Sequence, residues 1–302
     1  MGYLRRLPRF EYLAPRSVDE ACSVLAEHQG DARLFAGGTD LVLQMKRREI
    51  TPRTIIGLKG VPSLSSIRAQ AGGIAIGAMT TFGAIESSAL VRERYDFLCE
   101  TAAAIGSPEI RAVATVGGNL SGALPCADFP APLMTLGAVI RLRSVRGERA
   151  LALEDFFMEF AETAAAPDEI LTEIELPVRP GFTGGAYVKF RDRHAMDMTT
   201  TGVAACVTWD RERQVVDDVK IALSVSGPVP LRVKNAEAFL RGQAFTENAL
   251  EEAACLACQE AQPRTSWRAR KEFRQELIMV LTKKALRQAA GKARAATDRG
   301  NA

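Results

Sequence analysis

The sequence lacks any long run of apolar residues. No stretch of its 302 residues approaches the roughly 20 consecutive apolar residues of a membrane-spanning helix. Residues 1–10 also lack the apolar core of a secretory signal peptide. We therefore expect a soluble, cytoplasmic protein. Hydrophobic residues still make up 47% of the chain, enough to bury cores, and the length suits two or three domains.

Neither sign of charge is in large excess. The 39 basic and 36 acidic residues leave a formal net charge of +3, which is too balanced to indicate a nucleic-acid-binding protein. The six cysteines are scattered, and a cytoplasmic chain of this length has no need of disulfides, so we expect reduced thiols. Histidine is scarce, with only His28 and His194, and no Ser/His/Asp or Cys/His nucleophile pattern is found. No catalytic residue is predicted.

The first part of the chain is predicted to contain two α/β regions. In residues 1–60, the capping box Ser17-Val-Asp-Glu20 opens a helix, and an apolar run at 33–36 leads into a second helix and a strand. A middle α/β region is predicted for 61–177. It ends at a linker, 177–181, because two prolines and a glycine interrupt any regular element there.

The C-terminal part is predicted to combine a small antiparallel sheet with a helical bundle, over residues 178–290. Residues 291–302 are polar and small, which is typical of a flexible tail. Over the whole chain, predicted strands cover 54–58, 73–77, 137–143, 169–176, 186–190, 202–209 and 215–225, and predicted helices cover 40–48, two segments within 82–106, 233–241, 246–261 and 267–290.

Two glycine pairs carry most of the functional information. In Phe35-Ala-Gly-Gly-Thr-Asp-Leu41 an apolar strand runs into glycines that let the backbone approach a phosphate with its N–H groups turned inward. A second loop, Ala114-Thr-Val-Gly-Gly-Asn-Leu120, repeats this logic, and its Thr115 and Asn119 can add hydrogen bonds. Two such loops suit the two sides of one diphosphate. Taken singly, each pair fits a tight turn equally well.

Neither loop matches a common nucleotide-binding motif. No Gly-Lys-Ser/Thr follows either glycine pair, so a Walker A loop is absent. The Gly-x-Gly-x-x-Gly pattern of a Rossmann site is absent as well. ATP hydrolysis is therefore not expected.

The loops resemble those of the FAD-binding medium subunits of the molybdenum hydroxylases, the family of xanthine dehydrogenase, aerobic carbon monoxide dehydrogenase and 4-hydroxybenzoyl-CoA reductase. The resemblance includes an acidic residue in a proline-rich stretch, Pro125-Cys-Ala-Asp-Phe-Pro130, and extends over nearly the whole chain. It implies an α+β, PCMH-type FAD-binding fold, in which two α/β subdomains precede a three-stranded sheet with a helical bundle. It also implies an oxidoreductase with FAD bound non-covalently.

The resemblance further implies a set of cofactor-binding residues. Asp128 would reach the adenosine ribose, Leu171 and Ile105 would lie against or beside the flavin, and Lys189 would lie at its edge. From spacing alone, Asp128 fits a helix N-cap equally well, and Lys189 reads as a solvent-facing residue of a strand. The complete implied set is Leu34, Phe35, Ala36, Gly37, Gly38, Thr39, Asp40, Leu41, Ile105, Ala114, Thr115, Gly117, Gly118, Asn119, Asp128, Leu171 and Lys189.

Partner subunits are implied by the same resemblance. Electrons would leave substrate at a molybdenum cofactor on a large subunit and cross [2Fe–2S] clusters on a small subunit to this FAD. The flavin would then reduce NAD, a quinone, ferredoxin or oxygen. A basic C-terminal group is read either as a partner surface or as a solvated helix face. Its members are Arg264, Arg268, Arg270, Lys271, Arg274, Lys283, Lys284 and Arg287.

The remaining cysteines and histidines receive structural interpretations. The iron–sulfur insertion of the 4-hydroxybenzoyl-CoA reductase type is absent, Cys126 stands alone, and Cys255-x-x-Cys258 reads as two buried helix residues rather than a metal site. His28 reads as the end of a helix. His194 is placed either near the flavin rim or in a loop without a role.

Two other functions fit parts of the sequence. A self-contained FAD oxidoreductase would bind its substrate over the flavin, with Tyr187 and Lys189 available for acid–base work. A non-flavin module would use the glycine loops for another nucleotide or only for turns, and would be colourless.

Overall fold

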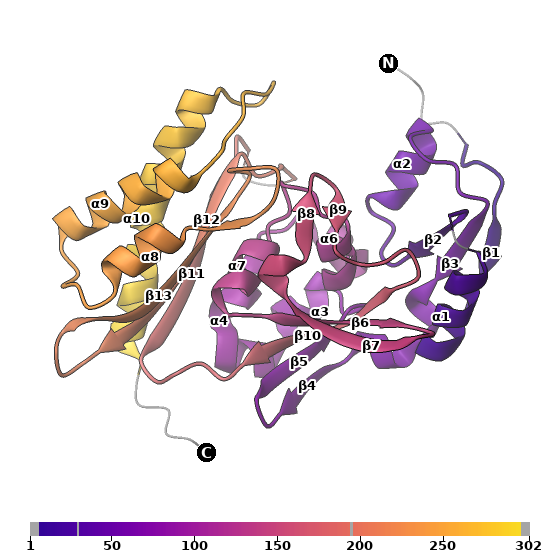
Figure 1. Cartoon of the computed structure of the whole chain (residues 1–302), viewed down its shortest axis with the longest axis horizontal. Coiled ribbons are helices and arrows are strands. Elements are labelled where there is room, and N and C mark those ends of the chain that lie inside the picture. Colours follow the sequence, from indigo (N-terminus) through magenta and orange to yellow (C-terminus); the bar gives the residue numbers. More distant parts are fainter. Residues whose placement is uncertain (1–5, 29, 194–195, 297–302) are drawn as a thin grey trace.

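Three main sheets follow one another along the chain (Figure 1). The computed structural model describes residues 6–28, 30–193 and 196–296. Each sheet falls within one of the predicted regions, and the mixture of helices and strands confirms the predicted α+β class. Within the described residues, no helix has both the length and the apolar character needed to cross a membrane.

The N-terminal sheet is parallel, with strand order β1-β3-β2. Helix α1 begins where predicted, because Ser17 Oγ accepts the backbone N–H of Glu20 at 3.1 Å. The Glu20 carboxylate accepts the N–H of Arg16 at 2.7 Å instead of that of Ser17, so only half of the predicted capping box forms. The elements are β1 (Glu11–Leu13), α1 (Val18–Glu27), β2 (Ala32–Phe35), α2 (Leu41–Arg47) and β3 (Thr54–Gly57).

The middle sheet is antiparallel, with strand order β4-β5-β10-β6-β7. Phe82 and Phe129 meet edge to face in its core, with ring centroids 5.0 Å apart. Its strands are β4 (Ile67–Gln70), β5 (Gly73–Gly77), β6 (Val139–Ser144), β7 (Gly147–Ala152) and β10 (Ile170–Pro177). Its helices are α3 (Phe82–Ser87), α4 (Ala89–Ala103), α5 (Pro108–Val113), α6 (Val116–Ser121) and α7 (Pro130–Thr135), with the short turns η1 (Leu58–Gly60), η2 (Pro62–Ser65) and η3 (Leu153–Asp155) and the hairpin β8 (Phe157–Glu159) and β9 (Glu162–Thr163) beside them.

The C-terminal sheet has four strands, in the order β11-β12-β13-β14, where the sequence predicted three. The predicted strands are present, and a two-residue edge strand too short to leave a periodic signal joins them. The elements are β11 (Thr183–Phe190), β12 (Thr201–Asp210), β13 (Val215–Ser224), β14 (Leu231–Arg232), α8 (Lys234–Leu240), α9 (Glu247–Glu260) and α10 (Lys271–Ala295).

Strand β12 is buried on both faces, which explains its nearly continuous run of apolar residues. Val203 and Ala205 belong to the core formed with helices α8 to α10. Ala204 and Cys206 point the other way, into the core of the middle region. On β11, Tyr187 packs against the same middle core. Side chains of alternate residues on this sheet therefore face the middle region and not solvent.

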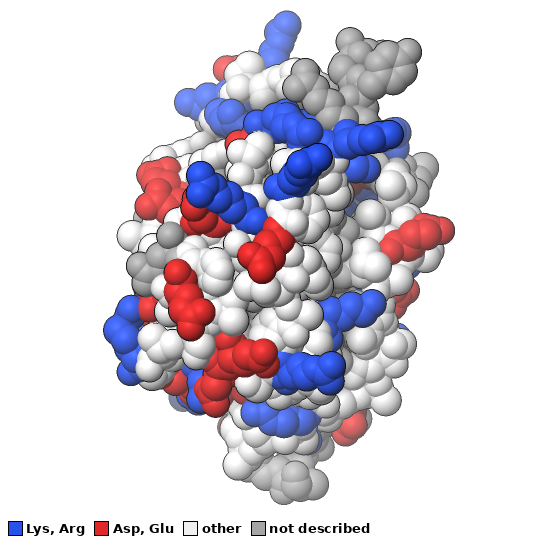
Figure 2. Space-filling view, turned by 90° about the vertical axis from the view of Figure 1, so that its right-hand side faces the viewer, with Lys and Arg blue, Asp and Glu red and all other residues white. Residues whose placement is uncertain are grey.

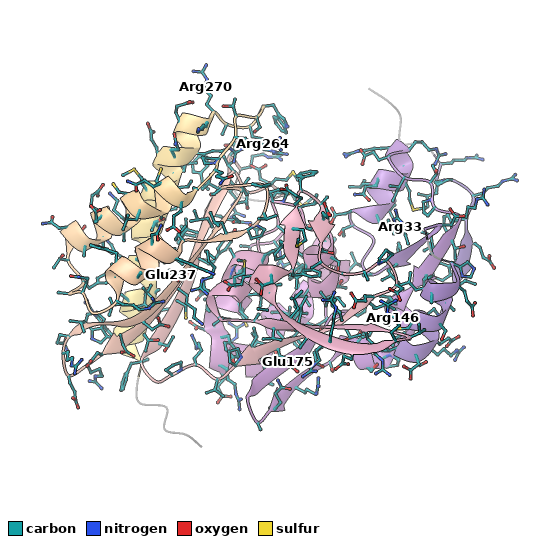
Figure 3. All side chains as sticks on the ribbon, viewed as in Figure 1. Arg33, Arg146, Glu175, Glu237, Arg264 and Arg270 are labelled. Atoms are coloured by element: carbon teal, nitrogen blue, oxygen red, sulfur yellow. The ribbon has the colours of Figure 1, made fainter. Side chains whose placement is uncertain are left out.

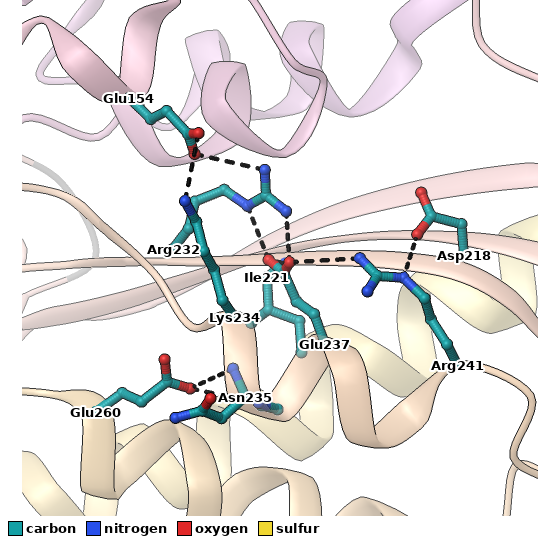
Figure 4. A network of polar contacts seen from close by, with 10 residues as sticks. Glu154, Asp218, Ile221, Arg232, Lys234, Asn235, Glu237, Arg241 and Glu260 are labelled. Atoms are coloured by element: carbon teal, nitrogen blue, oxygen red, sulfur yellow. Dashed lines mark hydrogen bonds and ion pairs between the residues drawn. The ribbon is translucent and has the colours of Figure 1, made fainter.

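A buried carboxylate helps to hold the C-terminal region together and lies beside its contact with the middle region (Figure 4). Glu237, on α8, accepts the backbone N–H of Ile221 and the Nε–H of Arg232, both at 2.8 Å. Arg241 lies 3.8 Å from the same carboxylate. Glu154, on η3 of the middle region, lies 3.6 Å from Arg232 and so links the two regions.

Helix α10 extends to Ala295, five residues beyond its predicted end, because Ala293 still packs in the core. The part of the predicted tail from 297 onward lies outside the described residues. We keep the division into 1–60, 61–177 and 178–290 as a proposal based on sheet membership. The middle core also includes side chains of the C-terminal sheet, so the regions are packed as neighbours.

Candidate functional site

One cavity, of about 500 Å³, brings the two glycine loops together. Its walls come from all three regions: the loop after β2, the loop before α6, strand β10 and the segment before β12. Of the residues implied by the resemblance, the walls include Leu34, Ala36, Gly37, Gly38, Thr39, Asp40, Leu41, Ile105, Ala114, Thr115, Gly117, Gly118, Asn119, Asp128 and Leu171.

A larger cavity, of about 720 Å³, lies elsewhere and is lined by Arg94, Tyr95, Arg179 and Lys292 among others. Neither glycine loop contributes to it. The presence of the two glycine loops, rather than the volume of the cavity, therefore identifies the candidate site.

The first loop offers free backbone donors. Strand β2 ends at Phe35 and α2 begins at Leu41, and Gly38 turns the chain between them with a φ of +73°. No acceptor within the described residues takes the backbone N–H of Gly38, Thr39 or Asp40. Consecutive free N–H groups facing a cavity form a cradle for an anion.

The second loop differs, because its backbone donors are already used. The N–H of Gly117 bonds to the carbonyl of Ala78 at 2.8 Å, and that of Gly118 bonds to Thr115 Oγ1 at 3.1 Å. Asn119 supplies a side chain instead: its Oδ1 is buried, and nothing within the described residues donates to it. The two loops therefore offer different groups, although their sequences look alike.

Close packing explains why both loops need glycine. A Cβ at Gly37 would lie 2.1 Å from the carbonyl oxygen of Val113, on the segment that leads into the second loop. A Cβ at Gly117 would lie 2.6 Å from that of Ala78. A side chain at Gly37 would push the two loops apart, and one at Gly117 would push the second loop away from the end of β5, so the glycines serve close backbone packing as well as ligand approach.

Asp128 lies at the cavity but is held by protein donors. Its Oδ1 accepts from Tyr187 Oη at 2.8 Å and from Thr199 Oγ1 at 2.5 Å, while Lys189 Nζ lies 2.5 Å from Oδ2. Helix α7 begins at Pro130 without any side-chain cap, so the N-cap interpretation of Asp128 is wrong. The residue instead joins the middle region to the C-terminal sheet.

Lys189 is buried, with a side chain only 6% exposed, so its interpretation as a solvent-facing residue is wrong as well. The reason is that β11 has packed neighbours on both faces. Its Nζ also donates to the carbonyl of Ala104 at 2.9 Å, next to the cavity residue Ile105. Lys189 and Phe35 do not line the cavity, and the Phe35 ring packs against Gly38.

Burial shifts the pKa values of several groups at the site. It raises the pKa of the Asp40 carboxyl, which makes protonation easier when an anion enters the cradle. Burial, followed by the charge of Asp128, raises the pKa of Tyr187 well above its usual value. Burial also raises the pKa of the Cys126 thiol, and Asp128 and Asp40 add to that effect.

The sequence analysis missed one wall of the cavity. Met196, Asp197, Met198 and Thr199 line it, and the C-terminal sheet brings them there. They carry no motif, so only the fold could place them. His194 lies outside the described residues, and His28 ends α1 as predicted.

The other cysteines stay away from the cavity. Cys255 and Cys258 are half-buried on α9, and all six cysteines, which are among the described residues, are free thiols. Within the described ranges, no group of three or more His, Cys, Asp or Glu side chains could hold a metal ion.

Comparison with known proteins decides the family. Residues 8–179 match the model of the FAD-binding domain in molybdopterin dehydrogenase, and residues 186–289 match that of the CO dehydrogenase flavoprotein C-terminal domain. The chain belongs to the FAD-binding medium subunits of the molybdenum hydroxylases. The resemblance noted in the two loops is thereby confirmed, and the chain is an oxidoreductase subunit whose cofactor is FAD.

Relatives of this family align with nearly the full chain. The carbon monoxide dehydrogenase medium chain of Hydrogenophaga pseudoflava is 33% identical over 282 residues, covering 93% of this chain and 97% of the relative. The xanthine dehydrogenase FAD-binding subunit of Escherichia coli O157:H7 is 32% identical over 280 residues, covering 92% and 95%.

Solved structures agree with this assignment. Carbon monoxide dehydrogenase from Hydrogenophaga pseudoflava superposes with a TM-score of 0.92 at 33% identity, covering 95% of this chain and 99% of that chain. Quinoline 2-oxidoreductase from Pseudomonas putida 86 reaches 0.90 at 27% identity, with the same coverage.

The residues present fit FAD. The free N–H groups of Gly38, Thr39 and Asp40 suit a diphosphate, and the unpartnered Oδ1 of Asn119 can accept from a hydroxyl or ring N–H. Leu171 and Ile105 supply apolar wall for a flat ring system.

Proposed function

We propose that this chain is the electron-transferring subunit of a molybdenum hydroxylase complex. It would take electrons from the [2Fe–2S] clusters of a small partner subunit and pass them to an external acceptor. The molybdenum cofactor and the substrate would be bound by a large partner subunit. The observation that carries this proposal is the full-length likeness to a carbon monoxide dehydrogenase medium chain, with both characteristic domains present.

The cavity supports electron transfer rather than independent catalysis. Bound FAD exchanges electrons through its own ring, so the protein has to bind and orient it. Within the described part of the wall there is no histidine or lysine. Tyr187 and Lys189, the two residues that the sequence offers for acid–base work in a self-contained oxidoreductase, are both held by Asp128. This geometry favours a role that needs no catalytic acid or base.

Residue roles follow from the same geometry. Gly38, Thr39 and Asp40 would hold the diphosphate through backbone N–H groups, and Asn119 Oδ1 would accept from a hydroxyl of the adjoining ribityl chain on the other side. Leu171 and Ile105 would contact the flavin ring. Two further contacts, of Asp128 with the adenosine ribose and of Lys189 with the flavin edge, are part of the proposal.

The external acceptor is proposed as a class: NAD, a quinone, ferredoxin or oxygen. Each can accept electrons from a reduced flavin.

The test is reduction of the flavin in the purified complex. We expect a tagged chain to carry releasable FAD and to retain a molybdenum subunit and a [2Fe–2S] subunit. Substrate should then bleach the flavin absorption of the complex but not that of the isolated chain. Bleaching and turnover by the isolated chain alone would contradict the proposal and favour a self-contained oxidoreductase.

A further inference from the structure

Trp267 is held outward on a fixed loop. Trp267 is 86% exposed, whereas the other tryptophan, Trp209, is 4% exposed. The loop between α9 and α10 is anchored by the buried Arg274, which donates to the carbonyl of Thr200 and, at 3.0 Å, to Ser266 Oγ. A large aromatic side chain that a folded loop keeps in water is typical of an interaction surface.

Trp267 is connected through Arg268 to the wall of the cavity that contains the glycine loops. The guanidinium of Arg268 stacks over the Trp267 ring, 4.1 Å from its centroid. The same guanidinium lies 2.8 Å from the sulfur of Met198. Met198 is 46% exposed and lines the cavity, as does Met196, which is 55% exposed. A partner covering Trp267 would therefore lie beside the mouth of this cavity.

The charge around Trp267 is basic and unneutralised. Arg264, Arg268, Arg270 and Lys271 form no ion pair with any acidic side chain in the described parts of the chain. Arg264 and Arg270 lie at the upper end of the molecule, where α10 begins (Figure 3). Figure 2 views the molecule from the side of the N-terminal sheet, so the Lys and Arg side chains gathered at its upper end belong to a different face from that of α9 and α10.

The rest of the basic C-terminal group behaves differently. Lys283 and Arg287 pair with Glu251 and Glu247 on α9, and Arg274 is buried. Each interpretation therefore fits a different part of the group: on α10, Lys283 and Arg287 are paired and Arg274 is buried, whereas the residues around Trp267 are free to meet a partner.

We propose that Met198, Arg264, Trp267, Arg268, Arg270 and Lys271, here called the Trp267 surface, form the docking site for an acidic face of the [2Fe–2S] subunit. This rests on the proposed function. An Arg-stacked tryptophan suits the centre of a protein interface, and the unpaired cations around it require an acidic rim. The position beside the FAD cavity suits a partner that delivers electrons.

Other occupants fit less well. A second copy of this chain would place basic residues against basic residues across a two-fold axis. A small-molecule acceptor would enter the cavity and leave Trp267 uncovered.

The experiment measures binding of the purified [2Fe–2S] subunit to the full chain loaded with FAD. We expect Trp267→Ala to weaken the Kd by about 30-fold or more, as truncation of an interface hot spot does. Arg268→Glu should weaken binding and slow association, and Trp267→Phe should retain most of the affinity. FAD content should stay unchanged, since Trp267 lies outside the cavity wall.

Two matched control variants test whether the loss of binding depends on where the substitution lies. Arg213→Glu places the same charge reversal at the opposite end of β12, on a side chain 83% exposed. Val280→Ala truncates an apolar residue 57% exposed on α10. Both should bind the [2Fe–2S] subunit like wild type.

Wild-type affinity in both Trp267→Ala and Arg268→Glu would overturn the inference. The inference would also be overturned if these two variants lost the molybdenum subunit but still bound the [2Fe–2S] subunit. If Trp267→Ala fails to fold, Arg268→Glu decides alone. A wild-type chain that binds the [2Fe–2S] subunit but is not reduced through it contradicts only the proposed function, whereas a chain that binds neither subunit overturns both.

Discussion

Lys189 Nζ lies 2.5 Å from Asp128 Oδ2, and this buried ion pair joins the C-terminal sheet to the loop that follows the second glycine pair. The two side chains are 6% and 10% exposed. Tyr187 and Thr199 donate to the other carboxylate oxygen, so both oxygens of Asp128 have protein partners. The ion pair lies directly behind the FAD cavity and fixes how the two regions meet there.

Replacing Asp128 by Asn should destabilise the protein strongly. The change leaves the buried Lys189 ammonium with the carbonyl of Ala104 as its remaining partner. Removing one member of a buried ion pair costs about 3–5 kcal/mol. Urea unfolding followed by circular dichroism measures the loss of unfolding free energy.

The matched variant is Thr199→Val, which removes one hydrogen bond to the Asp128 carboxylate and leaves the ion pair intact, so it should cost less, about 1.5–3 kcal/mol. The double variant Asp128→Asn with Lys189→Met should be less destabilised than the sum of the single variants, because the unpaired charge is then gone. An Asp128→Asn protein as stable as wild type contradicts this account of the ion pair.

Replacing Gly37 by Ala should weaken FAD binding. The new Cβ would meet the carbonyl oxygen of Val113 at 2.1 Å, so the two loops must separate. We expect the Kd for FAD to rise by about 10-fold or more, a loss of about 1.4 kcal/mol. Titration of the deflavinated protein with FAD, followed by flavin fluorescence, provides the measurement.

Gly72→Ala is the control for Gly37→Ala, because a Cβ at Gly72 meets nothing within 4 Å. It should bind FAD like wild type. Equal FAD affinity in the two variants would show that close contact of the loops is not needed for the site.

Local sequence signals were sufficient to predict the glycine loops and the longer elements. Gly37 and Gly117 interrupt apolar runs, and such breaks mark positions where the backbone must come close to another group. The helix starts at Ser17 and Thr246 were also predictable, since both side chains accept a backbone N–H from their first turn.

The surroundings of Asp128 and Lys189 could not be predicted in this way. Alternation along β11 indicates that Lys189 shares a face with Tyr187, but not that another region covers this face. The pairing spans 61 residues of sequence. Strand β14 and the cavity segment around Met198 were missed for a similar reason: they depend on tertiary packing and carry no local motif.

Stability should fall at high pH because of Cys206. Burial raises the pKa of its thiol to about 11 from a usual value of 9.0, so the folded state favours the neutral form. The contribution is fully present below pH 9.0 and is lost as pH rises towards about 11, because the unfolded chain ionises first. The slope should be about 1.4 kcal/mol per pH unit.

Unfolding in urea at several pH values from 8 upward would measure this loss. Cys206→Ala removes the titrating group, so its unfolding free energy should decline less steeply across the same range. A residual slope should remain, because burial also raises the pKa values of Tyr187 and of the other thiols Cys22, Cys99, Cys126 and Cys258. Parallel curves for wild type and Cys206→Ala would rule out Cys206 as the cause.

Replacing Glu237 by Gln should destabilise the C-terminal region. The carboxylate is 1% exposed and holds Arg232, whose side chain is 14% exposed, together with the backbone of Ile221. Loss of the charge leaves the mostly buried Arg232 guanidinium with Glu154, 3.6 Å away, as its remaining ion-pair partner among the described residues. The expected loss of unfolding free energy is about 3–5 kcal/mol. Urea unfolding monitored by circular dichroism measures it.

Glu154→Gln tests whether burial, rather than the presence of an ion pair, sets that cost. Glu154 meets the same guanidinium, at 3.6 Å, but its side chain is 33% exposed. Solvent screens such an exposed ion pair, so the loss of unfolding free energy should be about 1 kcal/mol or less. Equal losses of unfolding free energy for the two variants would contradict the account in which burial sets the cost. A large loss for Glu237→Gln alone assigns the effect to the buried carboxylate within the C-terminal region.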